Sequence, residues 1–150
     1  MRKLLAALAT VMFISFSAQA ITIHVPGDYR TIQAGINAAV DGDTVLVADG
    51  TYTGEGNKNI DFLGKTIVVI SENGPENCVI DCEDDGRGFY FHSGEDSNSV
   101  LEGVQIINGF CFFYGAGISC IFSSPTIKNC IISENRIMGI NDSVYLLCFY

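Results

Sequence analysis

Two near-repeats of apolar residues constrain the fold of this chain more than any other feature of its sequence. The first repeat runs from 99 to 109 (SVLEGVQIING) and the second from 125 to 135 (PTIKNCIISEN). An offset of 26 residues (127 − 101) aligns the apolar positions of the two segments: Leu101 with Ile127, Val104 with Cys130, and Ile106 with Ile132. Apolar positions that persist while polar ones drift are typical of units that stack on one another.

Each repeat is short, rich in β-branched residues and bounded by Gly, Asn, Ser or Pro, which indicates strands and turns rather than helix. Units of this size form the coils of a β-solenoid, in which parallel strands lie about 4.8 Å apart from coil to coil. The sequence therefore predicts an all-β fold, a right-handed parallel β-helix. The length after residue 20 suits about five or six coils.

Residues 1–20 have the pattern of an export signal. Arg2 and Lys3 precede an uncharged apolar run of 13 residues (16 − 4 + 1), and small residues occupy the first and third places of Ala18-Gln19-Ala20. A membrane anchor needs about 20 apolar residues, so this run is too short to be one. We predict a signal peptide at 1–20 and a single β-helix domain at 21–150, secreted or in the cell envelope and without a transmembrane span.

A short helix is predicted near the start of the domain, after an opening strand in which Ile21, Ile23 and Val25 alternate with polar residues. Its apolar stripe falls at i, i+4, i+7 and i+8, and Thr31 stands at its N-cap position; the stripe comprises Ile32, Ile36, Ala39 and Val40. A solenoid exposes its first coil, so an amphipathic helix is expected to cap that end. Further strands are expected at 44–48, 65–73, 78–81 and 88–92.

The last residues, 144–150, are apolar and carry no capping pattern. An uncovered last coil exposes strand edges, so it invites end-to-end self-association. We therefore expect either that the β-helix is truncated at its C-terminal end or that this tail pairs with a partner.

Charge and cysteine content narrow the partners. Without Arg2 and Lys3 the domain has 6 basic and 17 acidic residues, a net charge of −11 (6 − 17), which repels nucleic acid.

All six cysteines lie after residue 20 and allow 15 disulfide connectivities. Because Cys130 takes the place of Val104 in the repeat, we expect mostly buried thiols and at most one or two disulfides.

The segment from Tyr29 to Val45 (YRTIQAGINAAVDGDTV), followed by Gly50-Thr51-Tyr52, resembles the opening of pectin methylesterases and other exported β-helix proteins. The segment from Gly115 to Asn135 is similar to the degenerate repeats of bacterial envelope proteins. The chain thus resembles the pectin lyase-like superfamily, whose scaffold carries lyases, hydrolases, esterases and inert adhesins. The esterase pattern is incomplete here, because those enzymes place a Glu two residues after the Tyr of this motif, where the chain has Gly54 and Glu55 comes one residue later.

The densest acidic cluster follows the strand at 78–81. Its alternating carboxylates, Asp81, Glu83 and Asp85, precede Gly86 with the spacing of the first half of a calcium-binding loop, and hard oxygen ligands are what calcium prefers. The twelfth position of such a loop is His92 instead of Glu, so a solvated acidic turn is the competing interpretation. Calcium is accordingly the one cofactor that the sequence suggests, bound by these three residues.

Arg87 directly follows the acidic turn. Some polysaccharide lyases on the fold that this chain resembles pair calcium with an Arg base, which removes the proton that the metal acidifies. An ordinary salt-bridged turn explains the same residues. His24 and His92 are expected to point outward from alternating strands.

With no intact catalytic constellation, the sequence favours a non-catalytic β-helix module of a secreted or cell-envelope protein. Such a module would contact a polysaccharide or a cell-surface protein. The alternative is a carbohydrate-active enzyme of the lyase or esterase kind whose active-site residues are degenerate or missing.

Overall fold

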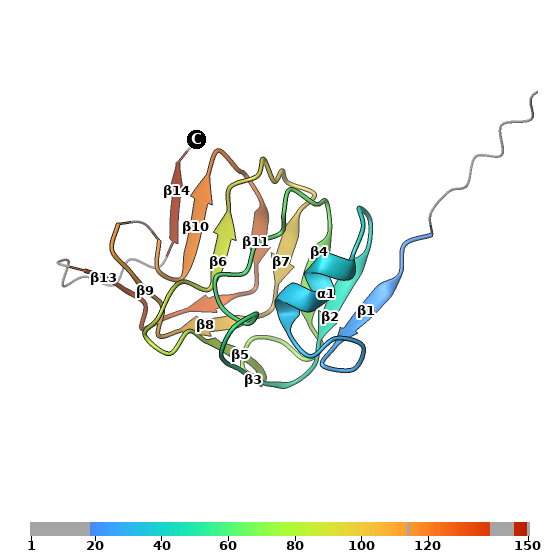
Figure 1. Cartoon of the computed structure of the whole chain (residues 1–150), viewed down its shortest axis with the longest axis horizontal. Coiled ribbons are helices and arrows are strands. Elements are labelled where there is room, and N and C mark those ends of the chain that lie inside the picture. Colours follow the sequence, from blue (N-terminus) through green and yellow to red (C-terminus); the bar gives the residue numbers. More distant parts are fainter. Residues whose placement is uncertain (1–18, 114, 139–145, 150) are drawn as a thin grey trace, which may run out of the picture.

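The computed structural model describes residues 19–113, 115–138 and 146–149, and these wind into a parallel β-solenoid with one short helix (Figure 1). The prediction of a mostly β fold, with parallel sheets stacked as a solenoid and one short helix near the N-terminus, is confirmed. The elements, in chain order, are β1 (Thr22–Val25), α1 (Ile32–Ala38), β2 (Thr44–Val47), β3 (Gly50–Tyr52), β4 (Val68–Ser71), β5 (Cys78–Asp81), β6 (Phe89–Phe91), β7 (Val100–Glu102), β8 (Gln105–Ile107), β9 (Phe110–Cys111), β10 (Ile118–Ile121), β11 (Thr126–Lys128), β12 (Ile131–Ile132), β13 (Arg136–Ile137) and β14 (Leu146–Phe149).

The strands form three main parallel sheets that make the walls of the solenoid. Their orders are β1-β2-β4-β7-β11, β3-β5-β8-β12 and β6-β10-β14, and β9 pairs with β13 in a small fourth sheet. Consecutive turns of the chain supply neighbouring strands in each wall, which is the arrangement that stacking requires. Leu101 pairs directly with Ile127, and Ile106 with Ile132, so the register that the two near-repeats predict is confirmed.

The described residues make about four turns, fewer than the five or six predicted from length. The turns differ in length, since paired residues are 22 apart from Ile23 to Val45 (45 − 23) and 32 apart from Val69 to Leu101 (101 − 69). Aligning Val47 with Val69, the last valines of their two strands, would give an interval of 22 (69 − 47), but these residues are not register partners. Val69 pairs with Val45, at an interval of 24 (69 − 45).

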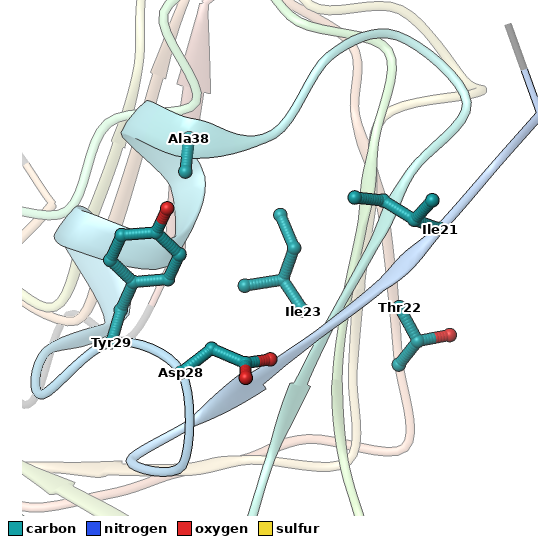
Figure 2. A pocket seen from close by; sticks show the side chains of 6 residues that line it. All are labelled: Ile21, Thr22, Ile23, Asp28, Tyr29 and Ala38. Atoms are coloured by element: carbon teal, nitrogen blue, oxygen red, sulfur yellow. The ribbon is translucent and has the colours of Figure 1, made fainter.

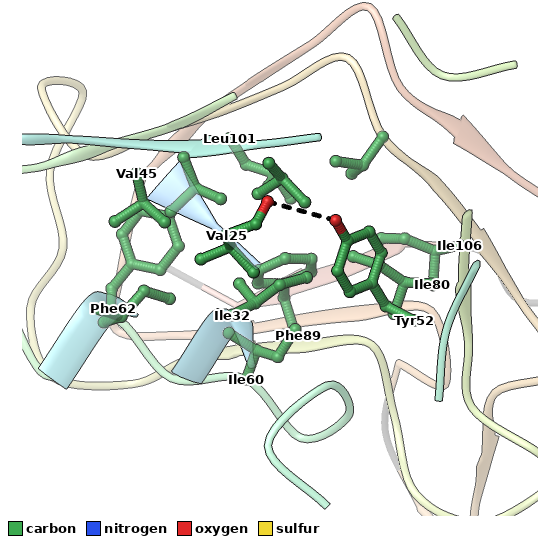
Figure 3. Close-up of a cluster of buried hydrophobic side chains, with 14 of the residues drawn as sticks. Val25, Ile32, Val45, Tyr52, Ile60, Phe62, Ile80, Phe89, Leu101 and Ile106 are labelled. Carbon is green, nitrogen blue, oxygen red and sulfur yellow. Dashed lines mark hydrogen bonds between the residues drawn. The ribbon is translucent and has the colours of Figure 1, made fainter. Parts of the chain in front are cut away.

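Inward side chains form columns along the axis of the solenoid. In the first wall one column runs through Ile23, Val45, Val69 and Leu101, all of them buried. Within the core, Tyr52 hydrogen-bonds through its hydroxyl group to the carbonyl oxygens of Val25, 3.3 Å away (Figure 3), and of Ala48, 2.9 Å away. Burial of this phenol raises its pKa to about 12, because the phenolate would lose its hydration.

Three phenylalanines fill the core behind the third wall. The ring centroids of Phe62 and Phe91 lie 4.8 Å apart, and those of Phe89 and Phe91 lie 6.1 Å apart. Phe89 and Phe91 point inward because they alternate with Tyr90 along β6, and this alternation places Tyr90 on the outer face.

Helix α1 packs against the inner side of β1 and β2 and closes the N-terminal end of the solenoid (Figure 1). The hydroxyl group of Thr31 accepts a hydrogen bond from the backbone N–H of Ala34, which confirms the predicted N-cap. Ile32 and Ile36 are buried, but Val40 is exposed because the helix ends at Ala38 and Ala39 is its C-cap.

The tail is described only at β14, which pairs in parallel with β10 and so extends the third wall. Residues 1–18, 139–145 and 150 lie outside the described part of the chain, and with them most of the predicted signal peptide and part of the apolar tail. Within the described residues, no helix has the length and apolar character needed to cross a membrane.

Candidate functional site

The outer face of β6 carries a cluster of planar polar side chains, which we call the β6 cluster: Asp61, Arg87, Tyr90 and His92. The rings of Tyr90 and His92 stack with their centroids 4.1 Å apart. The guanidinium carbon of Arg87 lies 4.6 Å from the centroid of the Tyr90 ring, within the range of a cation–π contact. These contacts hold the three side chains of one coil side by side on the surface.

Asp61 joins this cluster from the preceding coil. His92 Nε2 lies 3.1 Å from Asp61 Oδ2, and Asp61 Oδ1 accepts a hydrogen bond from the backbone N–H of Leu63 at 2.7 Å. The backbone N–H of Asp61 donates to the side-chain oxygen of Gln33 in α1, 2.8 Å away. The carboxylate is therefore fixed from both sides, and the helix that caps the fold also positions this residue.

Arg87 is anchored at both its backbone and its side chain. Its N–H donates to Asn59 Oδ1 at 3.0 Å, its carbonyl accepts from the N–H of Asn59, and Nη2 donates to Cys111 Sγ at 2.6 Å. Among the described residues no carboxylate forms an ion pair with Arg87. The acidic turn is salt-bridged, as the competing interpretation holds, but its cation is Lys58 and not Arg87.

The acidic turn faces Lys58. Lys58 Nζ lies 3.2 Å from Glu83 Oε2 and 3.1 Å from Asp85 Oδ2, and the hydrogen bond to Asp85 is the main cause that raises the pKa of this lysine. Asp81 Oδ1 instead accepts hydrogen bonds from the backbone N–H of Glu83 and from the amide of Asn108, both at 2.9 Å. The structure thus gives each of the three predicted calcium ligands a partner within the protein.

Within the described ranges, no group of three or more His, Cys, Asp or Glu side chains is arranged to hold a metal ion. Calcium could bind at Asp81, Glu83 and Asp85 only if Lys58 moved away from two of these carboxylates. Calcium binding by these residues stays a prediction, and Lys58 is the competitor that sequence spacing did not reveal.

The cysteines mostly serve the core. Cys78 and Cys82 are fully buried, and burial raises the pKa of each thiol to about 12, because a thiolate there would lose its hydration. Cys130 is half-buried and packs against the core, and burial also raises its pKa. These positions fit the expectation of mostly buried thiols.

A second candidate site is a pocket of about 410 Å³ between β1 and α1 (Figure 2). Its lining residues are Ile21, Thr22, Ile23, Asp28, Tyr29 and Ala38. The carboxylate of Asp28 already accepts a hydrogen bond from the backbone N–H of His24 at 2.7 Å. This pocket has fewer polar groups than the β6 cluster, so the cluster is the stronger candidate.

Sequence reasoning marked Arg87 and His92 separately and predicted correctly that His92 points outward. It missed the contact between His92 and Asp61, which lie 31 residues apart and meet only because consecutive coils stack. The alternation Phe89-Tyr90-Phe91 was the one signal that could have placed Tyr90 beside them.

The fold defines the class of the molecule as a parallel β-solenoid, and the β6 cluster is its best-formed polar surface. Beyond that class, no family model, no curated protein and no solved structure matches this chain.

Proposed function

We propose that this chain is an exported, non-catalytic β-helix module of a secreted or cell-envelope protein, and that it contacts a glycan through the outer face of β6. The observation that carries the proposal is the β6 cluster. Arg87, Tyr90 and His92 form a stacked row, and Asp61 is fixed beside His92. We also propose, from the sequence resemblance, that the chain is related to the pectin lyase-like superfamily.

The cluster has the chemistry that sugar recognition needs. Planar polar side chains offer several donors and acceptors in fixed directions, and an aromatic ring covers apolar surface. The four side chains contact one another, and the Arg87 side chain also donates to Cys111, while Asn59 and Gln33 fix the backbone N–H groups of Arg87 and Asp61. Little conformational entropy is therefore lost when a ligand binds. A protein ligand at the cell surface is the other partner class, and the test below includes it.

The contacts of Arg87 support binding over catalysis. A lyase mechanism of the type considered above needs the arginine beside metal-binding carboxylates, where it can remove an acidified proton. Here Arg87 stacks on Tyr90 and donates to Cys111, whereas Glu83 and Asp85 form ion pairs with Lys58. The alternative is a carbohydrate-active enzyme, which would be recognised by turnover of a polysaccharide.

The test is a glycan screen with the purified domain and its Tyr90→Ala variant. We expect binding to at least one polysaccharide, a loss of roughly tenfold or more in affinity for Tyr90→Ala, and no new products. The comparison variant is Tyr29→Ala, which removes a tyrosine that lines the pocket between β1 and α1. A loss of affinity in Tyr29→Ala and not in Tyr90→Ala would place the glycan in that pocket instead. Release of reducing or unsaturated sugars that disappears in Arg87→Ala would establish the enzyme instead, and binding only to surface proteins would exclude the glycan.

A further inference from the structure

A buried carboxylate ties together the turns that follow the third wall in three successive coils. Glu95 Oε1 accepts from the backbone N–H of Gly64 at 2.9 Å, and Glu95 Oε2 accepts from the N–H of Ser93 at 2.9 Å and from the hydroxyl group of Ser123 at 2.8 Å. Gly94 also donates to Ser123 Oγ at 3.2 Å. These bonds, the Glu95 ladder, fix the three turns relative to one another along one edge of the molecule (Figure 1).

One exposed side chain per coil stands directly before this ladder. Leu63 precedes Gly64, His92 precedes Ser93, and Phe122 precedes Ser123. Leu63 is 49% exposed and Phe122 is 80% exposed, and His92 is exposed between them. We call these three residues the corner row. With coils about 4.8 Å apart, the row spans about 10 Å along the solenoid axis.

Leu63 and Phe122, the two apolar members of the row, have a left-handed backbone conformation that glycine and asparagine adopt more easily. The φ angles of Leu63 and Phe122 are 60° and 51°, in the left-handed region. The other described non-glycine residues with positive φ are all Asn, Asp or Glu: Asn59, Glu83, Asp84, Asn108, Asn129 and Glu134. Glycine or asparagine would be less strained at 63 and 122. Large apolar side chains are thus kept at positions where they strain the backbone and bury little surface, which points to a contact with a ligand.

We propose that the corner row binds an uncharged, extended polysaccharide that lies along the solenoid axis. This inference rests on the proposed glycan-binding function and names its ligand class and direction. A sugar ring has an apolar C–H face and a rim of hydroxyl groups, so Leu63 and Phe122 contact ring faces while His92, backed by Asp61, bonds a hydroxyl group between them. Two carboxylates lie next to the row: Asp61 contacts His92, and the buried Glu95 is enclosed by its hydrogen bonds to Gly64, Ser93 and Ser123, so the row suits a neutral ligand.

Calorimetry with neutral oligosaccharides tests the proposal. The probes are cello- and xylo-oligosaccharides of two and six units, with oligogalacturonides of the same lengths as the acidic comparison. We expect the six-unit neutral sugars to bind at least roughly tenfold more tightly than the two-unit sugars, because only the longer chains reach all three coils.

The decisive variant is Phe122→Gly. It removes the ring and the strain together, so we expect neutral-sugar affinity to fall roughly tenfold while Tm stays level or rises. A fall in Tm would show that Phe122 has a structural role and would overturn the proposal. The matched control is Phe113→Gly, because Phe113 is 78% exposed but follows β9 on another part of the surface. This variant is expected to bind like the unaltered protein.

The remaining outcomes separate this inference from the proposed function. If no oligosaccharide or polysaccharide binds, both fail. If sugars bind and Tyr90→Ala weakens them, but Phe122→Gly and chain length have no effect, the corner row is not the site and only this inference fails. If only the acidic oligogalacturonides bind, the neutral ligand class is wrong.

Discussion

Glu95 is a buried acid without a cationic partner among the described residues, yet it is charged. Burial raises the pKa of its carboxyl group, but donors from Ser93, Gly64 and Ser123 outweigh burial, and the pKa is lowered overall. The carboxylate therefore stabilises the fold by accepting hydrogen bonds that would otherwise be lost in three turns. Loss of the Glu95 carboxylate would therefore loosen the three turns that carry the corner row.

We expect Glu95→Gln to lower the free energy of unfolding by about 1–3 kcal/mol at pH 7, because an amide N–H₂ replaces one accepting oxygen and faces buried donors. Urea unfolding followed by circular dichroism measures this change. The control is Glu76→Gln, since Glu76 is exposed and should change stability by no more than about 0.5 kcal/mol.

Acid should weaken the same contact. A carboxyl group whose pKa is lower in the folded state stabilises the fold fully above its unfolded pKa of about 4.3, and this contribution is lost as pH falls through the folded pKa. We expect the unaltered protein to lose more unfolding free energy between pH 6 and pH 3 than Glu95→Gln does. Equal losses in the two proteins would show that Glu95 does not contribute to acid sensitivity.

The calcium prediction can be tested through Lys58, which pairs with two of the three proposed ligands. If Asp81, Glu83 and Asp85 bind calcium, Lys58→Met removes a competing cation and should tighten binding measured by calorimetry with millimolar calcium. The variant Lys128→Met removes a lysine elsewhere on the surface and should leave the titration unchanged. Absence of binding heat in both the unaltered protein and Lys58→Met would make the calcium prediction wrong.

At the scale of elements, α1 depends on a residue from the next coil. Lys65 Nζ donates to the carbonyl oxygens of Ile36, Asn37 and Ala39 at distances of 2.7 to 3.0 Å. The last carbonyls of a helix have no partner within it, and a cation at this end also complements the helix dipole. A seven-residue helix needs such tertiary contacts, because helices this short are unstable alone.

We expect Lys65→Met to destabilise the N-terminal cap by about 1–3 kcal/mol, since three carbonyls lose a charged donor. Hydrogen exchange should speed up first in α1 and only weakly in β7 and β8. The matched control is Lys128→Met, which breaks a surface ion pair with Glu102 and should change stability by less than about 1 kcal/mol. Unchanged exchange in α1 would contradict the role assigned to Lys65.

The elements also show how far the sequence alone could lead. Alternation identified inward faces correctly, and near-repeats gave the pairing of Leu101 with Ile127. Alternation could not distinguish Val47 from Val45 as the partner of Val69, because a shift of two residues keeps every side chain on the same face of the sheet. Strand β10 was missed because its sequence begins within a glycine-rich stretch, where turn residues hide the strand.

The candidate site was harder to predict for a related reason. The β6 cluster and the corner row join residues from successive coils of unequal length, and turn conformation decides which residues become neighbours. The positive φ angles of Leu63 and Phe122 have no sequence signal, because neither residue type favours that region. Sequence patterns thus specify the walls of the solenoid but not the chemistry displayed on its corners.

At the scale of the whole molecule, the two ends of the solenoid differ. The outward backbone groups of His24 in the edge strand β1 are already used, since its N–H donates to Asp28 Oδ2 and its carbonyl accepts from the N–H groups of Asp28 and Tyr29. This turn blocks strand pairing beside His24, at the C-terminal half of β1. The predicted end-to-end association would therefore have to join the other ends of two copies.

At that other end, β11 and β12 each pair with one strand within the described residues, and the inward side chains of Ile127 and Ile132 are only partly buried. Two copies that meet there would pair apolar edges but would also bring together two chains of net charge −9 each (8 − 17). Charge repulsion opposes this contact, and salt screens it, because the Debye length falls from about 30 Å at 0.01 M to about 8 Å at 0.15 M.

We therefore propose self-association that strengthens with ionic strength, and light scattering after gel filtration at 0.01 M and 0.5 M salt tests it. The dimer fraction should rise with salt and with protein concentration, and Ile127→Lys should abolish it by placing a charge on the edge. Phe113→Lys, which adds the same charge away from this end, should dimerise like the unaltered protein. A monomer at every salt and protein concentration would contradict self-association. Dimers that dissociate at high salt would instead indicate an ion-paired interface elsewhere on the molecule.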